Sequence, residues 1–310
     1  MLLHDIPDIG LQNINMPLLR EHKVQLDILR VDKVHSEISG NKWFKLKYNL
    51  LEAGTQGYAT LLTFGGAFSN HLYATAAAGK LHGFKTIGIV RGEKTLPLNS
   101  TLTYAEAQGM RLEFINRDAY RRRGEAEFQQ RLVAQFGPCY ILPEGGSNRL
   151  AVKGCTEIVQ KPENYDYISC SIGTGGTVAG ILEKTLNKNQ LLGFSALKGG
   201  NFLYDEINTL TRAYSGNHYT NYRIVEDYHF GGYAKANTEL VNFINQFKQL
   251  HQIQLDPVYT GKMMYGLLDM VEKGYFSTGS SILAIHSGGL QGITGFNERF
   301  QKKNLRILVD

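Results

Sequence analysis

A lysine at the expected start of a helix is the first residue of this sequence that could carry chemistry. Residues 39–50 read Ser-Gly-Asn-Lys followed by an amphipathic segment, and Ser39 or Asn41 could cap the helix. Three lysines fall within six positions: Lys42, Lys45 and Lys47. A lysine acts as a nucleophile or base only after losing its proton, which requires a shielded site that lowers its pKa. Taken alone, Lys42 is either such a residue or a surface charge.

Four glycine-rich turns follow short apolar segments along the chain. They cover residues 63–71, 143–148, 172–180 and 285–289. Glycine lets the backbone adopt positive φ angles and lets a ligand approach the main chain closely. The third turn contains Gly173-Thr174-Gly175-Gly176-Thr177 and leads into an expected helix. Such a turn can present several backbone N–H groups and a helix N-terminus to one phosphate.

The third turn matches neither of the common nucleotide-binding patterns. No Gly-Lys-Ser/Thr follows it, as a Walker A loop requires, and Val178 occupies the last glycine position of a GxGxxG pattern. No acidic residue ends a following strand at the distance that a dinucleotide site needs. A single phosphate group fits this turn better than a nucleotide, and a plain strand-to-helix turn is the alternative.

A phosphate-binding turn, a lysine at a helix start and several glycine turns are the parts that a pyridoxal 5′-phosphate (PLP) site needs. The lysine must bond covalently to the aldehyde of this cofactor, which again requires a lowered pKa. On these residues alone, a PLP site and a solvent-exposed Lys42 both remain open.

Six segments resemble, in the same order, motifs of one family of fold-type II PLP enzymes, that of D-cysteine desulfhydrase and 1-aminocyclopropane-1-carboxylate (ACC) deaminase. The segments are SGNKWFKLKYNL, GGAFSNH, PEGGSN, GTGGTVAG, LDPVYTGKMMYGLLD and HSGG. The resemblance covers about residues 30–295, which is most of the chain. Six motifs in family order are far more specific than any one of them.

The resemblance implies roles for the lysine motif and the phosphate turn. Lys42 matches the lysine that bonds to PLP and moves protons on and off the substrate carbons. Lys45 matches a second family lysine near the site, with an ordinary helix charge as the alternative. Asn41 is either a contact near the cofactor or a helix cap. The residues that match the family's phosphate-binding turn are Gly173, Thr174, Gly175, Gly176 and Thr177.

The resemblance also implies how the ring and the substrate are held. Asn70 matches the asparagine that hydrogen-bonds the 3′ oxygen of PLP, and Ser69 matches the serine that faces the substrate carboxylate at a helix start. Tyr259 matches a tyrosine near the substrate, a candidate proton donor or acceptor. Tyr233 is a less secure match to a second such tyrosine, with core packing as the alternative. His71 is adjacent in sequence and has no expected catalytic role.

Two departures from the family pattern bear on the substrate. Trp43-Phe44 stands where the family usually has an arginine before the second lysine, which removes a cation near the site. Thr260 stands where ACC deaminases have glutamate and desulfhydrases have threonine. Thr260 or Ser287 would then offer the pyridine nitrogen a neutral hydroxyl, which makes PLP a weaker electron sink. Elimination of a thiolate tolerates a weak sink better than opening of a cyclopropane ring does.

We therefore expect a lyase that performs β-elimination on D-cysteine, or on a related small D-amino acid, to give pyruvate, ammonia and hydrogen sulfide. Hydrolase is a further expected description, because the aminoacrylate product hydrolyses. The alternative is an ACC deaminase that gives 2-oxobutyrate and ammonia. A non-catalytic binding protein on the same fold is a weaker alternative. The missing dinucleotide fingerprint argues against an oxidoreductase.

The elements that must position these residues alternate along the chain. Strand patterns at 58–64, 85–92, 111–115, 139–146, 165–172, 190–197 and 280–289 alternate with helical patterns, among them 69–83, 98–109, 118–136 and 148–160. Such alternation predicts an α/β fold with parallel sheets covered by helices, and ligands beyond the carboxyl ends of the strands. The expected architecture is that of a two-domain fold-type II PLP enzyme, similar to the tryptophan synthase β chain. Residues 1–55 plus 157–310 are predicted to form the larger domain, residues 56–156 the smaller one, and the cleft between them the cofactor site.

Composition limits the partners. The chain has 310 residues, of which 43% are hydrophobic and 20% are charged, with a formal net charge of +5. The densest basic run, Arg121–Arg123, is followed at once by acidic residues, so we expect a solvated helix face and no nucleic-acid binding. We expect no signal peptide and no membrane contact, because no basic region precedes an apolar core and no apolar stretch is long enough.

The cysteines predict a cytoplasmic protein without metal. Cys139, Cys155 and Cys170 are odd in number and lack both CxxC spacing and a histidine pair nearby. Buried free thiols in a reducing compartment are therefore expected. The expected small-molecule partner is an amino acid, and the family resemblance implies a homodimer.

Overall fold

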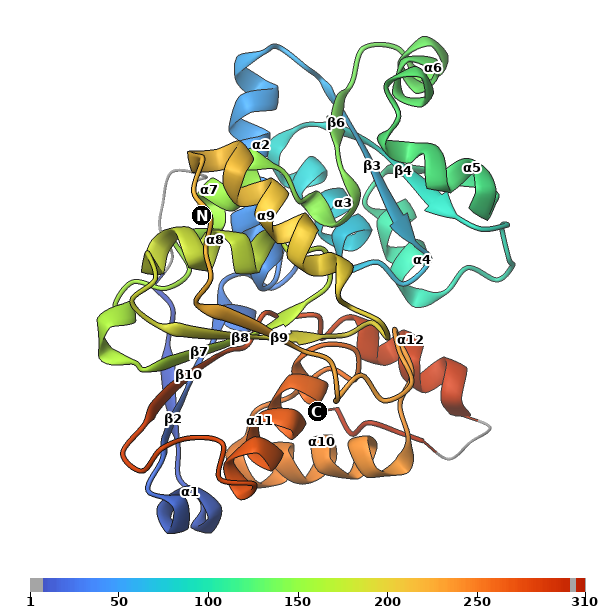
Figure 1. Cartoon of the computed structure of the whole chain (residues 1–310). Helices are drawn as coiled ribbons and strands as arrows, with labels where there is room; N and C mark the ends of the chain where they lie inside the picture. Colours follow the sequence, from blue (N-terminus) through green and yellow to red (C-terminus); the bar gives the residue numbers. More distant parts are fainter. Residues whose placement is uncertain (1–7, 302–304, 310) are drawn as a thin grey trace.

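The computed structural model describes residues 8–301 and 305–309, which form two sheets covered by helices (Figure 1). The larger sheet has six strands in the order β1-β2-β10-β7-β8-β9. β1 is antiparallel to β2, and the other neighbouring strands are parallel. The strands are β1 (Leu11–Ile14), β2 (Gln25–Leu29), β7 (Tyr167–Ile172), β8 (Gln190–Ser195), β9 (Tyr222–Val225) and β10 (Ser281–Ile285).

The smaller sheet has four parallel strands in the order β5-β4-β3-β6. They are β3 (Thr60–Gly66), β4 (Lys85–Arg91), β5 (Met110–Ile115) and β6 (Tyr140–Leu142). Residues 61–64 of β3 are all at most 1% exposed. Burial of successive residues on both faces is the pattern of a parallel strand covered by helices on each side.

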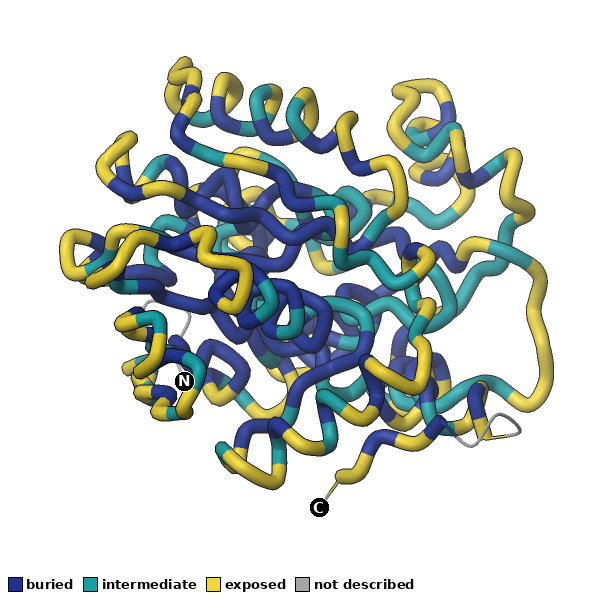
Figure 2. The backbone as a smooth tube through the Cα atoms, turned by 60° about the horizontal axis from the view of Figure 1, so that its bottom comes forward, coloured by how far each residue is buried: buried dark blue, intermediate teal, exposed yellow. Residues whose placement is uncertain are grey.

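Helices cover both sheets. In Figure 1, α7, α8 and α9 lie above the six-stranded sheet, and α10 and α11 lie below it. Figure 2 shows the buried segments gathered at the centre and the exposed ones on outer helices and loops. The helices are α1 (Pro17–His22), α2 (Asn41–Thr55), α3 (Asn70–His82), α4 (Ser100–Ala107), α5 (Arg117–Arg121), α6 (Ala126–Phe136), α7 (Arg149–Cys155), α8 (Gly176–Thr185), α9 (Phe202–Ser215), α10 (Thr238–His251), α11 (Thr260–Glu272) and α12 (Gly292–Phe300). Short 3₁₀ segments lie at Val31–Lys33, Arg122–Gly124, Glu144–Gly146 and Pro162–Asn164.

The α/β fold is confirmed, and the elements differ from the prediction in few places. The single helix expected at 118–136 is two helices, α5 and α6, because Gly124 ends a 3₁₀ turn and Glu125 has an extended backbone. The elements β1, α1, β2 and β9 were not expected. β9 is a four-residue strand whose first half is not deeply buried, so it lacks a strong apolar pattern.

The expected cap of α2 is wrong. Gly40 precedes the helix without a side-chain cap, and the Ser39 hydroxyl donates instead to the carbonyl of Asp32 at 2.8 Å. The Asn41 side chain is likewise engaged elsewhere, as described below. By contrast, Ser69 caps α3 by accepting hydrogen bonds from the N–H groups of His71 and Leu72, and Gly83 ends this helix at φ +77°.

The division into two domains stays a prediction. Every strand of the four-stranded sheet lies within residues 56–156, while α7, also in that range, packs against α2, α8 and α9. Within residues 8–301 and 305–309, no helix has the length and apolar character that crossing a membrane requires. Part of the N-terminal segment for which no signal peptide was expected, residues 1–7, lies outside the described residues.

Candidate active site

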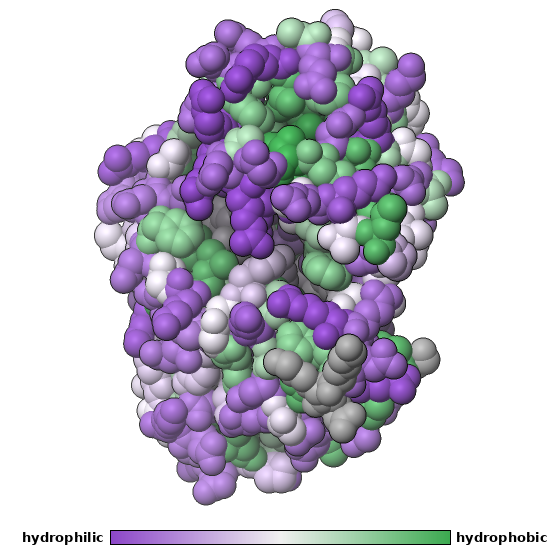
Figure 3. Space-filling view, turned by 90° about the vertical axis from the view of Figure 1, so that its right-hand side faces the viewer, coloured by the Kyte–Doolittle hydropathy of each residue, from purple (hydrophilic) through white to green (hydrophobic). Residues whose placement is uncertain are grey.

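A large cavity collects most of the predicted site residues. Its volume is about 1010 Å³, and it lies where the ends of β3, β4 and β7 meet the start of α2. Figure 3 shows the face on which hydrophilic side chains border a hollow at mid-height. The predicted residues that line this main cavity are Asn41, Lys42, Lys45, Ser69, Asn70, Gly173, Thr174, Gly175, Thr177, Tyr233, Tyr259 and Ser287. The two predicted residues outside the lining are Gly176 and Thr260.

The turn before α2 fixes the position of Lys42. Gly40 has φ +68°, and a Cβ atom at this position would lie 2.0 Å from the carbonyl oxygen of Ser287. The Asn41 N–H donates to that same carbonyl at 3.1 Å. The glycine of the Ser-Gly-Asn-Lys motif is therefore required, because only a residue without Cβ lets the start of α2 lie directly against the turn after β10.

Asn41 connects the lysine with the phosphate turn. Its amide nitrogen donates to the Thr177 hydroxyl at 2.8 Å, and its amide oxygen accepts a hydrogen bond from Lys42 Nζ at 3.2 Å. Burial, followed by the nearby charge of Lys45, lowers the pKa of Lys42 to about 7. A large fraction of Lys42 is therefore neutral near neutral pH, which is the form that attacks an aldehyde or removes a proton.

Lys45 is not an ordinary helix charge. The residue is 2% exposed, and its ammonium donates to the Gly145 carbonyl, the Ser147 hydroxyl and the Thr174 hydroxyl at 3.2, 2.9 and 3.3 Å. Burial lowers its pKa. Lys45 thus holds the second and third glycine turns together and brings a positive charge beside the start of α8.

The third glycine turn is shaped for an anion. Gly175 adopts φ +77° and precedes α8 without a side-chain cap, and the first turn of α8 has no acidic residue. The N–H groups at the start of this helix are therefore available, and the helix dipole favours a negative charge there. Gly176 is the first residue of α8 and is buried beside Lys45, since a Cβ atom would lie 3.1 Å from its Nζ. These features fit the phosphate group of PLP.

A second helix N-terminus faces the same cavity. Ser69 and Asn70 lie at the start of α3 and line the cavity, and the first turn of α3 has no acidic residue. Ser69 Oγ accepts hydrogen bonds from the N–H groups of His71 and Leu72 at 3.2 and 3.3 Å. Because the hydroxyl accepts both bonds, its own proton stays available for a ligand oxygen.

Two tyrosines close the opposite side of the cavity. The rings of Tyr233 and Tyr259 meet edge to face, with centroids 6.1 Å apart. Burial around its hydroxyl is the main cause that raises the pKa of Tyr233, although the residue as a whole is partly exposed. Burial and the neighbouring Tyr233 raise the pKa of Tyr259 well above its ordinary value. Both hydroxyls therefore keep their protons at neutral pH. Tyr233 is 41% exposed, so it is not the core residue that was considered as an alternative.

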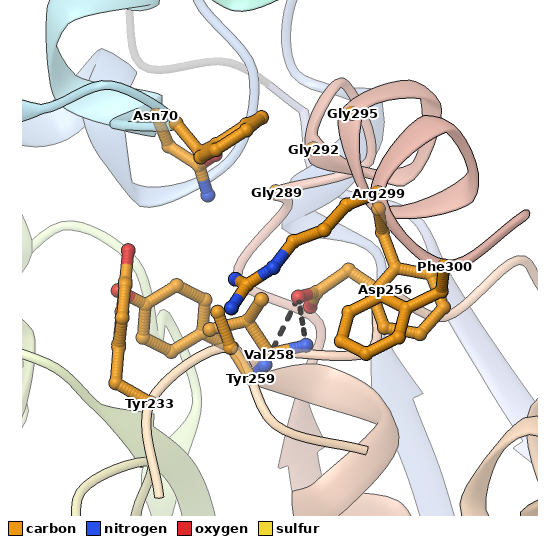
Figure 4. A pocket seen from close by; sticks show the side chains of 13 residues that line it. Asn70, Tyr233, Asp256, Val258, Tyr259, Gly289, Gly292, Gly295, Arg299 and Phe300 are labelled. Atoms are coloured by element: carbon orange, nitrogen blue, oxygen red, sulfur yellow. Dashed lines mark hydrogen bonds between the residues drawn. The ribbon is translucent and has the colours of Figure 1, made fainter. Parts of the chain in front are cut away.

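Asp256 holds the segment that carries Tyr259. The carboxylate accepts hydrogen bonds from the N–H groups of Val258 and Tyr259 at 2.8 and 2.9 Å (Figure 4). It also accepts hydrogen bonds from both the N–H and the hydroxyl of Thr260 at 2.8 and 2.7 Å. The Thr260 hydroxyl is thereby engaged away from the cavity. Ser287, in contrast, lines the cavity, and its hydroxyl lies 3.1 Å from that of Ser171.

Trp43 and Phe44 do not face the cavity. They are 1% and 0% exposed and belong to a hydrophobic core, where Trp43 stacks on His35. The departure from the family pattern at these positions therefore alters the core beneath α2 rather than the wall of the cavity.

His71, for which no catalytic role was expected, is 1% exposed and also lines the cavity. Its Nε2 lies 2.8 Å from the Thr63 hydroxyl, which itself donates to the Leu142 carbonyl, so Nε2 carries the proton. Burial and the charges of Lys42 and Lys45 lower its pKa well below the ordinary value. His71 is thus a neutral imidazole whose Nδ1 has no hydrogen-bond partner among the described residues.

Comparison with known proteins agrees with this geometry. Residues 17–288 match the family described as "Pyridoxal-phosphate dependent enzyme". The chain is 30% identical to a putative ACC deaminase of Pyrococcus abyssi, over 94% of this chain and 91% of the relative. It is 31% identical to the bifunctional D-cysteine desulfhydrase/ACC deaminase, mitochondrial, of Arabidopsis thaliana, over 90% of this chain and 75% of the relative.

A solved structure supports the same relationship. The crystal structure of an ACC deaminase homologue superposes with a TM-score of 0.82 and 26% identity, covering 96% of this chain and 94% of that one. The relatives are named for deamination and desulfuration, so the added description as a hydrolase is wrong. The chain belongs to the pyridoxal-phosphate-dependent enzymes, as a lyase or deaminase of the family of D-cysteine desulfhydrase and ACC deaminase, and it uses PLP.

Proposed function

We propose that this enzyme performs β-elimination on D-cysteine or a related small D-amino acid, giving pyruvate, ammonia and hydrogen sulfide. The observation that carries the proposal is the position of Lys42, whose pKa is lowered to about 7 beside the anion-binding start of α8. A reactive amine next to a phosphate site is the arrangement that PLP chemistry requires.

Each side chain has a proposed task in this reaction. The bound cofactor withdraws electrons from the α-carbon of the substrate. Lys42 receives the α-proton, and Ser69, with the N–H groups at the start of α3, binds the substrate carboxylate. Asn70 positions the ring, and Tyr259, with Tyr233 beside it, donates a proton to the departing sulfur. The carbon–sulfur bond breaks with its electron pair on sulfur, and water converts the aminoacrylate that remains to pyruvate and ammonia.

The choice of D-cysteine over ACC rests on the partner of the pyridine nitrogen. Because Thr260 is occupied by Asp256, we propose that the Ser287 hydroxyl meets this nitrogen. A hydroxyl leaves the ring a weaker electron sink than a carboxylic acid would, and loss of a thiolate tolerates this better than ring opening. The Arabidopsis relative is named for both activities, so ACC deamination is the second candidate.

A substrate panel tests the proposal. Purified enzyme with PLP is incubated with D-cysteine, D-serine, β-chloro-D-alanine and ACC, and pyruvate and 2-oxobutyrate are measured separately. We expect pyruvate from D-cysteine and β-chloro-D-alanine, and none of either product from Lys42→Ala. Formation of 2-oxobutyrate alone would favour the deaminase, and no product from any substrate would favour a non-catalytic binding protein.

Two further expectations concern the whole protein. We propose that the enzyme acts as a homodimer, on family resemblance, and in the cytoplasm. The three free, buried cysteines fit a reducing compartment. Light scattering of the purified protein would measure twice the mass of one chain if the dimer is correct.

A further inference from the structure

A small side pocket opens from the main cavity at its tyrosine side. Its volume is about 30 Å³, which is more than a single water molecule needs. Its walls are largely aromatic and aliphatic, and it shares Tyr233, Tyr259 and Asn70 with the main cavity (Figure 4). Other residues that line the side pocket are Phe68, Val258, Phe296, Arg299 and Phe300.

Arg299 places a positive charge at this pocket. Its side chain extends from α12 toward the two tyrosines and lines both cavities (Figure 4). Among residues 8–301 and 305–309 it has no ion pair and no hydrogen bond, and its one described interaction is with the ring of Phe300, 5.2 Å from the guanidinium carbon. Of the other arginines at the main cavity, Arg123 is paired with Glu144 at 2.7 Å and Arg121 with Asp118 at 2.8 Å. Arg91 and Arg117 also have no ion pair among the described residues, but they do not line the side pocket. The guanidinium of Arg299 is therefore available to an anion.

The nearby acidic group, Asp256, makes no ion pair with Arg299 among the described residues. Asp256 also lines the side pocket, but its two carboxylate oxygens accept four hydrogen bonds from residues 258–260, and it is 1% exposed. Tyr233 and Tyr259 stay protonated, since both pKa values are raised. The acidic residues of the main cavity, Glu144 and Glu206, do not line the side pocket.

We propose that Arg299 binds an anionic group at the far end of the substrate side chain. This assignment rests on the proposed elimination. It means that the enzyme selects D-amino acids whose β-substituent ends in a carboxylate or a similar anion. The cofactor beside Lys42 would hold the amino end, Ser69 the α-carboxylate, and the side pocket the second anion. In the elimination the Cα–H bond gives its proton to Lys42, and the Cβ–S bond breaks with its electrons on a thiolate that carries the anion. Water then converts the aminoacrylate to pyruvate and ammonia.

Binding of an isosteric acid and amide tests this assignment without any turnover. D-glutamate and D-glutamine lack a leaving group at Cβ, and their affinities for the PLP-loaded enzyme are measured by calorimetry. We expect D-glutamate to bind about tenfold more tightly than D-glutamine, because the amide of D-glutamine cannot form the charge-assisted bond to the guanidinium of Arg299. The preference should fall to about one in Arg299→Gln, be partly kept in Arg299→Lys, and weaken at high salt because Arg299 is exposed.

A matched control variant and a comparison of two substrates' elimination rates separate the possible outcomes. Arg20→Gln, an exposed arginine on α1 that lines neither cavity, should keep the preference of the native enzyme. S-carboxymethyl-D-cysteine should give pyruvate faster than S-carbamoylmethyl-D-cysteine, again only with Arg299 present. Equal binding of acid and amide, or a preference that survives Arg299→Gln, would overturn the assignment. If no substrate yields pyruvate but the binding preference depends on Arg299, the proposed elimination fails and the anion site stands.

Discussion

Lys42 and Lys45 show how the surroundings give two lysines of one helix different properties. Both are on α2 and both have a lowered pKa, for which burial is the largest cause. Lys45 donates to three oxygens from two turns, whereas Lys42 meets only Asn41 among the described residues. Lys45 is therefore held between the two turns, while the Lys42 amine is free to react.

The lowered pKa of Lys42 predicts the pH dependence of cofactor binding. Only the neutral amine attacks the aldehyde, and with a pKa of about 7 its fraction falls about tenfold per pH unit below pH 7. The rate at which cofactor-free enzyme binds PLP, followed by stopped-flow absorbance, should therefore rise up to about pH 7 and then level off. A rate that keeps rising to pH 10 would mean an unshielded lysine.

The position of Lys45 predicts an effect on cofactor affinity. In Lys45→Met the methylene stem is largely kept but the charge beside the start of α8 is lost, so we expect PLP to bind about 10- to 100-fold more weakly. Lys47→Met is a matched control, because Lys47 is equally buried on α2 but is bonded to Glu157 and lines no described cavity. Fluorescence titration with PLP should separate the two variants, and equal affinities would contradict the role given to Lys45.

At the scale of elements, one lysine of α11 holds the segment that carries Tyr233. Lys262 is 2% exposed and donates to the carbonyls of His229 and Gly232 at 2.9 and 2.8 Å. Around these residues the backbone takes positive φ angles at Phe230, Gly231, Gly232 and Ala234. A segment of this shape lacks the regular backbone hydrogen bonds of a helix or a strand, so its position depends on Lys262.

Loss of this anchor should disturb catalysis at a distance. In Lys262→Met two carbonyls lose their charged donor, so we expect the free energy of unfolding to fall by about 1–3 kcal/mol. We also expect KM to rise, because Tyr233 becomes less well placed. Denaturant unfolding and steady-state kinetics measure the two effects. Lys273→Met, an exposed residue paired with Asp269 on the same helix, should change neither by much. An unchanged KM in Lys262→Met would show that the segment is held by other contacts.

The elements that could be predicted are those whose signal is local. Ser69 and Gly83 bound α3 as expected, because a cap and a left-handed glycine act within one turn of the helix. The expected cap of α2 was wrong, since Ser39 bonds to Asp32, seven residues earlier, and Asn41 bonds to Thr177, which is distant in sequence. Thr260 was one of the two hydroxyls expected at the pyridine nitrogen, and its bond to Asp256, four residues earlier in the chain, draws it away.

At the scale of the whole molecule, the site exists only when distant parts of the chain meet. The main cavity takes residues from α2, from the turns after β3, β7 and β10, and from the segments at Tyr233 and Tyr259. The ordered motifs revealed the residues near the expected cofactor. They could not reveal Arg299, which lies beyond the last motif and reaches the site only through the packing of α12.

This arrangement predicts that PLP stabilises the folded chain. The unfolded chain has no assembled cavity, so PLP at 100 times its dissociation constant should add about 2.7 kcal/mol to the free energy of unfolding. Thermal unfolding monitored by calorimetry should show a higher Tm with PLP, and a smaller rise with pyridoxal, which lacks the phosphate. Equal shifts with both would contradict the anion site at the start of α8.

The central claim is that Lys42, among 33 lysine and arginine residues, is the one that bonds to the cofactor. Borohydride reduction of the PLP-loaded enzyme makes this bond permanent, and peptide mass spectrometry then locates it. We expect one pyridoxyl phosphate group per chain, on Lys42. A group found on Lys45 or Lys262, or no stable attachment at all, would contradict the account.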